Sequence, residues 1–283
     1  MVDISVPVHK ITVPITSDEL TLNVSGDQHL GVQHVTREGI IEAAHEQSDK
    51  HKGNLFRVFT GDLTENALKT SIGHNYDLKL ADPAIQKEQM KEILHEIMER
   101  HYGPSVFKKL KIPTSKNTTG CMAVGCCGNH EYRTRKQSGQ WIDKEMYDAG
   151  KILSLGMHGI IELTVLNKKL KMSKVYRIFV SHRPTGGTGT SLATLMRGML
   201  KKRADVPGCD LYIYGHFHKR VIMPDGHYDS TTGKFKKLLY VVNPSPLHDM
   251  EYADVAGYSP LVTGYHVNVF LPLEENKFPY GTV

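Results

Sequence analysis

Five short polar motifs, each placed after a run of apolar residues, constrain this chain more than any other feature. In chain order they are Asp27-Gln28-His29, Gly61-Asp62, Gly128-Asn129-His130-Glu131, Ser181-His182 and Gly215-His216-Phe217-His218. The apolar runs, such as residues 56–59 and 211–214, are short and rich in aromatic and β-branched residues, which is typical of buried strands. Polar side chains at the carboxyl ends of several strands are where α/β folds build their sites. The pattern therefore predicts one polar site assembled from five distant segments.

The residue types in these motifs favour metal binding. Together they supply carboxylates, an amide oxygen and several imidazoles, which is a ligand set for divalent metals. Two such metals about 3.5–4 Å apart neutralise phosphate oxygens and acidify a shared water, as hydrolysis of a phosphate ester requires. Asp27 and His29 are spaced at i and i+2, so both side chains point to one face if strand geometry persists there. Glycines precede the polar residues at four motifs and allow sharp turns and close backbone approach. They are Gly26, Gly61, Gly128 and Gly215.

Taken in order, the motifs resemble those of the calcineurin-like metallophosphoesterase superfamily, in particular its dinuclear-metal phosphodiesterase and nuclease branch. The resemblance runs from Asp27 to His218 and covers most of the chain. It implies an α/β fold of two packed, mixed β-sheets flanked by helices, which is a four-layer αββα sandwich with the metals at one edge. We expect a single domain over residues 1–283, with a possible cap or insertion at about residues 63–120.

The same resemblance implies seven metal ligands in two groups joined by a bridge. They are Asp27, His29 and His218 for the first metal, Asn129, His182 and His216 for the second, and Asp62 between the two. His130 would lie just outside the metals as the catalytic residue, protonating the leaving group or stabilising the transition state. Glu131 would orient a neighbour. An oxygen and nitrogen ligand set does not choose among Mn²⁺, Fe and Zn²⁺.

The function expected from this site is hydrolysis of a phosphoester. The resemblance favours a phosphodiesterase or nuclease acting on a nucleotide or nucleic acid through a hydroxide that bridges the metals. Two alternatives stay open. A phosphomonoesterase acting on a small molecule would use the same ligands. A non-catalytic scaffold would keep the fold, but such relatives usually lose ligands, whereas all seven and His130 are present here.

Composition places few further limits on function. The chain has 283 residues and four cysteines, at positions 121, 126, 127 and 209. No C-x-x-C pair occurs, so buried, reduced thiols are expected rather than a zinc knuckle. No apolar run approaches the ~20 residues that span a bilayer. The first residues lack the pattern of a signal peptide. A cytoplasmic protein without a membrane partner is therefore expected, and its oligomeric state stays open.

The formal net charge is +5, and much of it lies in local clusters of basic residues. These clusters are residues 108–111, 168–171, 201–203 and 234–237. A solvated face explains each of them. Alternatively, they form an electrostatic funnel for a polyanionic substrate. The choice depends on whether the clusters share a face with the metal motifs.

Apolar periodicity and turn residues predict the elements between the motifs. The expected helices are residues 37–52, 82 to about 101, 141–149 and 191–203. The expected strands include residues 6–15, the pairs 160–166 with 175–180 and 220–223 with 238–242, and a last strand at 265–271. The loop at residues 183–190 is expected to rim the site, and His74 and His248 lie in loops within reach of it.

Overall fold

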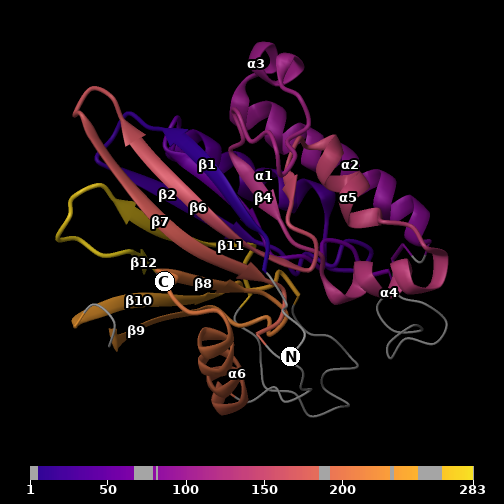
Figure 1. Ribbon diagram of the computed structural model, residues 1–283. Helices are drawn as coiled ribbons and strands as arrows, with labels where there is room; N and C mark the ends of the chain where they lie inside the picture. Colours follow the sequence, from indigo (N-terminus) through magenta and orange to yellow (C-terminus); the bar gives the residue numbers. More distant parts are fainter. Residues whose placement is uncertain are drawn as a thin grey trace.

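The computed structural model describes residues 6–66, 79–80, 82–184, 192–229, 233–247 and 263–282. Two six-stranded β-sheets pack face to face, and helices cover their outer faces (Figure 1). This arrangement confirms the α/β sandwich of two mixed sheets that the sequence predicted. None of the helices within the described ranges combines the length and apolarity needed to cross a lipid bilayer.

The first sheet carries three of the five motifs at one edge. Its strands, in spatial order, are β12 (Tyr280–Thr282), β11 (His266–Pro272), β2 (Glu19–Ser25), β3 (Leu55–Phe59), β4 (Ala123–Gly125) and β5 (Leu153–Ser154). Strands β2 to β5 are parallel, and β11 runs antiparallel to β2. Because parallel strands end at the same edge, the segments after β2, β3 and β4 bring Asp27, Asp62 and Asn129 to one place.

The second sheet carries the other two motifs. Its strands, in spatial order, are β1 (Val8–Pro14), β6 (His158–Asn167), β7 (Met172–Ser181), β8 (Leu211–Tyr214), β10 (Lys234–Val242) and β9 (Val221–Asp229). Strands β7, β8 and β10 are parallel, so His182 and the segment that follows β8 leave the sheet at the same edge. The two predicted antiparallel pairs are confirmed as the β6–β7 and β9–β10 hairpins.

Alternating side chains explain the layers. Inward-facing residues such as Val24, Val58 and Ile213 form the core between the sheets. On the outer face of the first sheet, Ile93 and Met146 pack with Phe59. The helices there are α1 (Arg37–Lys50), α2 (Pro83–Tyr102) and α5 (Ile142–Ala149), and α6 (Leu192–Asp205) covers the second sheet. The start of α2 is as predicted, with Asp82 accepting a hydrogen bond from the backbone N–H of Ala84 at 2.8 Å.

Four short elements were not predicted. They are α3 (Pro104–Lys109), α4 (Asn129–Ser138), β5 and β12. Helix α4 has only Glu131 buried, so it lacks the apolar stripe by which a helix is recognised in sequence. The predicted last strand, at residues 265–271, is followed in the chain by β12, which pairs with it. Within residues 63–120, α2 and α3 are described while residues 67–78 and 81 are not, and the predicted cap stays a prediction.

Candidate metal centre

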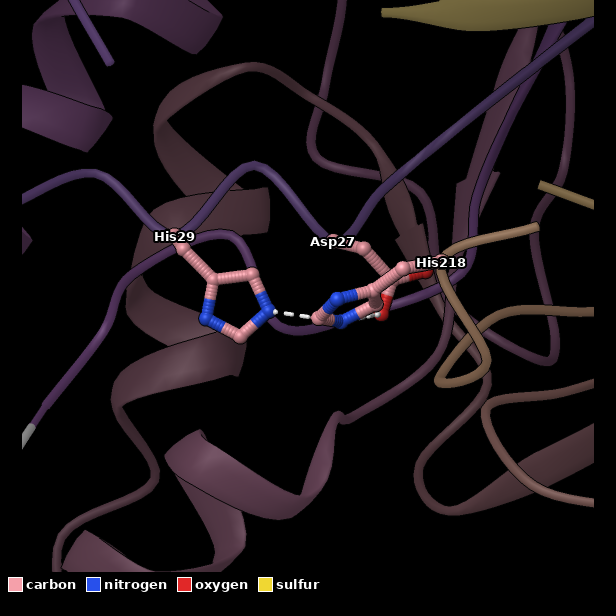
Figure 2. A group of neighbouring side chains, drawn as sticks. All are labelled: Asp27, His29 and His218. Atoms are coloured by element: carbon pink, nitrogen blue, oxygen red, sulfur yellow. Dashed lines mark hydrogen bonds and ion pairs between the residues drawn. The ribbon is translucent and has the colours of Figure 1, made fainter. Parts of the chain in front are cut away.

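Metal-ligand side chains from distant segments gather where the parallel strands end. One group is Asp27, His29 and His218, and another is Asp62, His182 and His216, with the ligand atoms of each group within 4.8 Å of one another. Figure 2 shows the first group, with the ring of His29 pointing toward that of His218 beside the Asp27 carboxylate. These two groups draw on four of the five predicted motifs, and a third group, His29, Glu65 and His130, adds the fifth. The role of each ligand stays a prediction.

In the first group, two imidazole nitrogens face each other. His29 Nε2 lies 3.1 Å from His218 Nε2, which in turn lies 3.5 Å from Asp27 Oδ1. The other ring nitrogen of His29, Nδ1, lies 2.6 Å from Glu65 Oε2 and so carries the proton that this carboxylate accepts. In the neutral ring, Nε2 then carries a lone pair that points into the group. A metal ion is a natural partner for that lone pair.

In the second group, acceptor atoms converge in the same way. His182 Nδ1 lies 2.8 Å from the carbonyl oxygen of Thr60, to which it donates, so the neutral ring presents a lone pair at Nε2. That Nε2 lies 2.9 Å from Asn129 Oδ1 and 3.0 Å from Asp62 Oδ2. Three acceptors at this spacing repel unless a cation or a proton lies among them. The residues present therefore fit a metal ion.

The pKa values of the site residues reflect the same need for positive charge. Burial lowers the pKa of His182, but the carboxylates of Asp62 and Asp27 more than offset this and raise it to about 9. Burial raises the pKa of Asp62, yet the neighbouring histidines hold it well below its usual range. Burial lowers the pKa of His216 to about 3, which keeps that ring neutral and able to bind a metal. The carboxylates thus favour positive charge at His182, as they would favour a bound metal ion.

The backbone at the ligands is not that of a strand. Asp27 and His29 have φ angles of 49° and 50°, in the left-handed region. The assumption that strand geometry persists through this motif is therefore wrong. Asp62, His216 and His218 share the conformation, with φ of 47°, 73° and 52°. Each such residue costs on the order of 1–3 kcal/mol, and such strain gathers at functional sites. Asp and His tolerate it better than most residue types, which favours them here.

Close backbone approach at two glycines brings the ligands together, as the sequence predicted. A Cβ added at Gly61, where φ is +88°, would lie 2.4 Å from the backbone nitrogen of Gly128. A Cβ at Gly128 would lie 2.1 Å from both the backbone nitrogen and Oδ1 of Asp62. The ends of β3 and β4 therefore touch through their backbones, and only glycine allows Asp62 and Asn129 to lie side by side.

Gly128→Ala is expected to displace Asp62 and to lower turnover about 100-fold, because misplacing a reacting group by about 1 Å has that effect. Metal content measured on the same samples should fall with turnover. Gly139→Ala is the control, since a Cβ there has open space around it and costs only backbone strain at φ +73°. Equal losses in both variants would show that the contact with Asp62 does not matter.

Glu131 orients a neighbour, as predicted. Its carboxylate accepts hydrogen bonds from the backbone N–H groups of Asp62, Leu63 and Gly128, at 3.0, 2.7 and 3.1 Å. Burial, and then the charge of Asp62, raise its pKa to about 7. The bonds tie the turn after β3 to the start of α4. Asn243 and Ser245 fix the Asp27 loop in the same way, donating to the carbonyl oxygens of Gly26 at 2.9 Å and Asp27 at 2.7 Å.

His130 lies beside the two groups, in the first turn of α4. Its backbone N–H donates to Asp62 Oδ1 at 2.8 Å, and its Nε2 lies 3.8 Å from Asp62 Oδ2. Its ring meets that of His29 edge-on, with 4.7 Å between centroids. The imidazole thus lies next to the predicted metal ligands His29 and Asp62.

Glu65 is a site residue that sequence reasoning missed. Besides its bond to His29, its Oε1 lies 3.4 Å from His130 Nδ1, and its carbonyl oxygen also contacts that nitrogen. The only signal in the sequence is a glutamate three residues after Asp62, which alone is not distinctive. One carboxylate thus orients both a predicted metal ligand and the predicted catalytic residue.

Glu65→Ala is expected to weaken metal binding about 10- to 100-fold, the usual effect of removing the carboxylate behind a metal-binding histidine. Titration of the metal-free protein with Mn²⁺, followed by calorimetry, measures this directly. Glu92→Ala removes an exposed glutamate on α2 and should leave the affinity unchanged. Unchanged affinity in Glu65→Ala would mean that His29 needs no such support.

Three other predictions fall outside the described residues. His74, His248 and the loop at residues 185–190 are not described, so their proximity to the site stays untested. The four cysteines are free and buried, as expected.

The sequence matches no protein-family model and no curated protein at a significant level. Among solved structures, it matches a predicted phosphoesterase from Streptococcus pneumoniae with 10% identity and a TM-score of 0.35, over 94% of this chain and 100% of that one. It matches the anchor in the inner membrane complex of Plasmodium with 13% identity and a TM-score of 0.41, over 94% and 88%. For a 5'-nucleotidase precursor from Thermus thermophilus, identity is 10% and the TM-score 0.37, over 89% and 50%.

Similarities this weak carry no argument about function. Any inference about the chemistry of this protein therefore rests on the residues of its own site. The two-sheet sandwich is the fold that the resemblance to the calcineurin-like metallophosphoesterases implied.

Proposed function

We propose that this protein is a metal-dependent phosphoester hydrolase, and specifically a phosphodiesterase acting on a nucleotide or nucleic acid. The observation that carries the proposal is the convergence of three possible ligand atoms, His182 Nε2, Asn129 Oδ1 and Asp62 Oδ2. There, His182 Nε2 lies within 3.0 Å of oxygen atoms of both Asn129 and Asp62. A metal ion can bind all three atoms at once.

The chain offers ligands for two divalent metals. The first would be held by Asp27, His29 and His218, and the second by Asn129, His182 and His216, with Asp62 between them. When bound, such a pair neutralises phosphate charge and acidifies water at neutral pH. The donors are imidazole nitrogens and oxygens without a thiolate, which suits Mn²⁺, Fe or Zn²⁺.

The protein's own residues would orient the substrate and move the proton. His130 would donate a proton from Nε2 to the departing oxygen, and the contacts of Nδ1 with Glu65 support this role because they hold the ring. Glu131 keeps Asp62 in place through the backbone of the turn. The residue proposed for acid catalysis therefore lies beside the residues proposed for metal binding.

A non-catalytic scaffold is the second candidate, and the backbone argues against it. Five of the seven predicted ligands hold left-handed φ angles, each of which costs stability. A protein that only presented a surface would gain nothing from this strain. A phosphomonoesterase would use the same geometry, so substrate tests must separate monoester from diester.

The test is Mn²⁺-dependent hydrolysis of bis(p-nitrophenyl) phosphate compared with p-nitrophenyl phosphate. The proposal predicts preference for the diester. Preference for the monoester would make the protein a phosphatase. Activity on neither substrate, with metals bound, would favour a narrow substrate range or the scaffold.

A further inference from the structure

Two of the basic clusters lie at the end of the sandwich opposite the metal ligands. Strand β7 leads from Lys174 near its start to His182 just after its end, a span of roughly 25 Å at about 3.3 Å per residue. Strand β10 begins at Lys234 and runs parallel to it through β8. The turn of the β6–β7 hairpin, the segment before β12 and the start of β10 all lie on the left of Figure 1, from top to bottom. These lysines therefore do not line the metal centre.

A groove of about 290 Å³ opens at this far end. Its main lining residues are Lys174, Phe235, Lys236, Lys237, Lys277 and Phe278. The four lysines outnumber the two acidic residues of the lining, Asp210 and Glu275. The lysines of the β6–β7 turn, at residues 168, 169 and 171, are also exposed, at the same end of β7 as Lys174. The groove is thus suited to an anion.

Two phenylalanine rings in this groove are unusually exposed. Phe235 is 64% exposed and Phe278 is 45% exposed. Phe235 rests on the backbone of Gly226, where an added Cβ would lie 2.2 Å from its ring. The ammonium of Lys237 lies 4.5 Å from the centroid of the Phe278 ring. Each ring is therefore supported on one side while much of it stays open to solvent.

The alternation of β10 shows that these side chains are not part of the core. Leu239 and Val241 point into the space between the sheets. By the period of two, Phe235 and Lys237 belong to the same face, further toward the strand's start. An aliphatic residue at position 237 would extend the core, whereas the lysine ends it. The strand thus presents a ring and a positive charge next to each other at the open end of the sandwich.

We propose that this groove binds single-stranded nucleic acid. Bases would stack on Phe235 and Phe278, and Lys237 with its neighbours would contact the phosphates. An acidic peptide would use the lysines and leave the rings without partners. A duplex would keep its bases stacked on one another and out of reach. The groove would thus hold a strand independently of hydrolysis, and binding there does not depend on the proposed function.

Other contacts set which lysines matter most. Lys174 donates to the carbonyl oxygens of Glu274 and Lys277, both at 2.8 Å, and Lys236 pairs with Asp210 at 3.0 Å. These two lysines shape the groove. Lys237 is exposed and lies against Phe278, so it is the one best placed to meet a phosphate.

The test is fluorescence anisotropy of a labelled 20-nucleotide oligothymidine, with EDTA present so that no hydrolysis occurs. We expect binding that weakens as salt rises. Phe235→Ala should weaken binding about 5- to 100-fold, the range for loss of one stacking ring. Lys237→Ala should weaken binding and also reduce its salt dependence. Trp141→Ala removes a 44% exposed ring, stacked with Arg135 on another element, and should change nothing.

The groove variants should hydrolyse nitrophenyl phosphates at the unaltered rate, which separates this proposal from the metal-centre function. Thermal unfolding checks that each variant is folded. No binding by the unaltered protein overturns the proposal, as does equal binding by the unaltered protein and Phe235→Ala. Equally tight binding of duplex DNA would rule out stacking. Displacement by polyglutamate at matched charge concentration would instead identify an acidic protein as the partner.

Discussion

Asp62→Asn should reduce bound metal from two ions per chain to one or none. Asp62 Oδ2 lies 3.0 Å from His182 Nε2 and 3.8 Å from His130 Nε2, so this carboxylate is central to the site. Asparagine keeps the shape but removes the negative charge that a bridging ligand supplies. Losing several kcal/mol of transition-state stabilisation corresponds to a fall in turnover of roughly a thousandfold. Elemental analysis and steady-state kinetics on one preparation measure both effects.

Asp49→Asn is the matched control for this change. Asp49 pairs with Arg100 at 2.9 Å on the protein surface, and its side chain is 58% exposed. Neither metal content nor turnover should change in this variant. Two metals per chain in Asp62→Asn would remove Asp62 as the bridging ligand, whatever happened to the rate.

His130→Ala should leave both metals bound and still lower turnover. The backbone N–H of residue 130, which bonds to Asp62 Oδ1, survives the substitution, so Asp62 keeps its position. General acid catalysis contributes about 10²- to 10⁴-fold, and we expect a loss in that range on alkyl phosphodiesters. The loss should be far smaller on p-nitrophenyl esters, because p-nitrophenolate leaves without a proton. The measurement that decides is the ratio of the turnover rate on alkyl phosphodiesters to that on p-nitrophenyl esters.

His95→Ala provides the comparison on an exposed histidine of α2, and we expect both rates to be unaffected. An equal loss on both kinds of ester in His130→Ala would assign this residue to stabilising charge rather than donating a proton. Loss of metal would instead make His130 a ligand.

The fold and the gathering of the motifs were predictable because both depend on patterns that are local in sequence. Each motif follows a short apolar run, and parallel strands must end at a common edge, so side chains as far apart as Asp27 and His218 meet. Helix α2 was predictable from its Asp-Pro start and its stripe of buried residues. In these cases the residue pattern within a segment itself determines the structure of that segment.

The parts that were not predicted depend on tertiary contacts. Asp27 and His29 have left-handed φ angles, and their backbone N–H groups donate to the carbonyl oxygens of Gly61 and Asp62 at 2.8 and 3.1 Å. No residue pattern predicts these contacts with a distant segment. Glu65 matters only because His29 and His130 lie on either side of it. Helix α4 buries only Glu131, so it lacks the apolar stripe by which helices are found.

The most direct test of the two-metal site is a crystal grown with Mn²⁺ and measured at the manganese absorption edge. We expect two anomalous peaks. One should lie among Asp27, His29 and His218, and the other among Asn129, His182 and His216, with Asp62 contacting both. A single peak, or peaks away from these side chains, would contradict the dinuclear site.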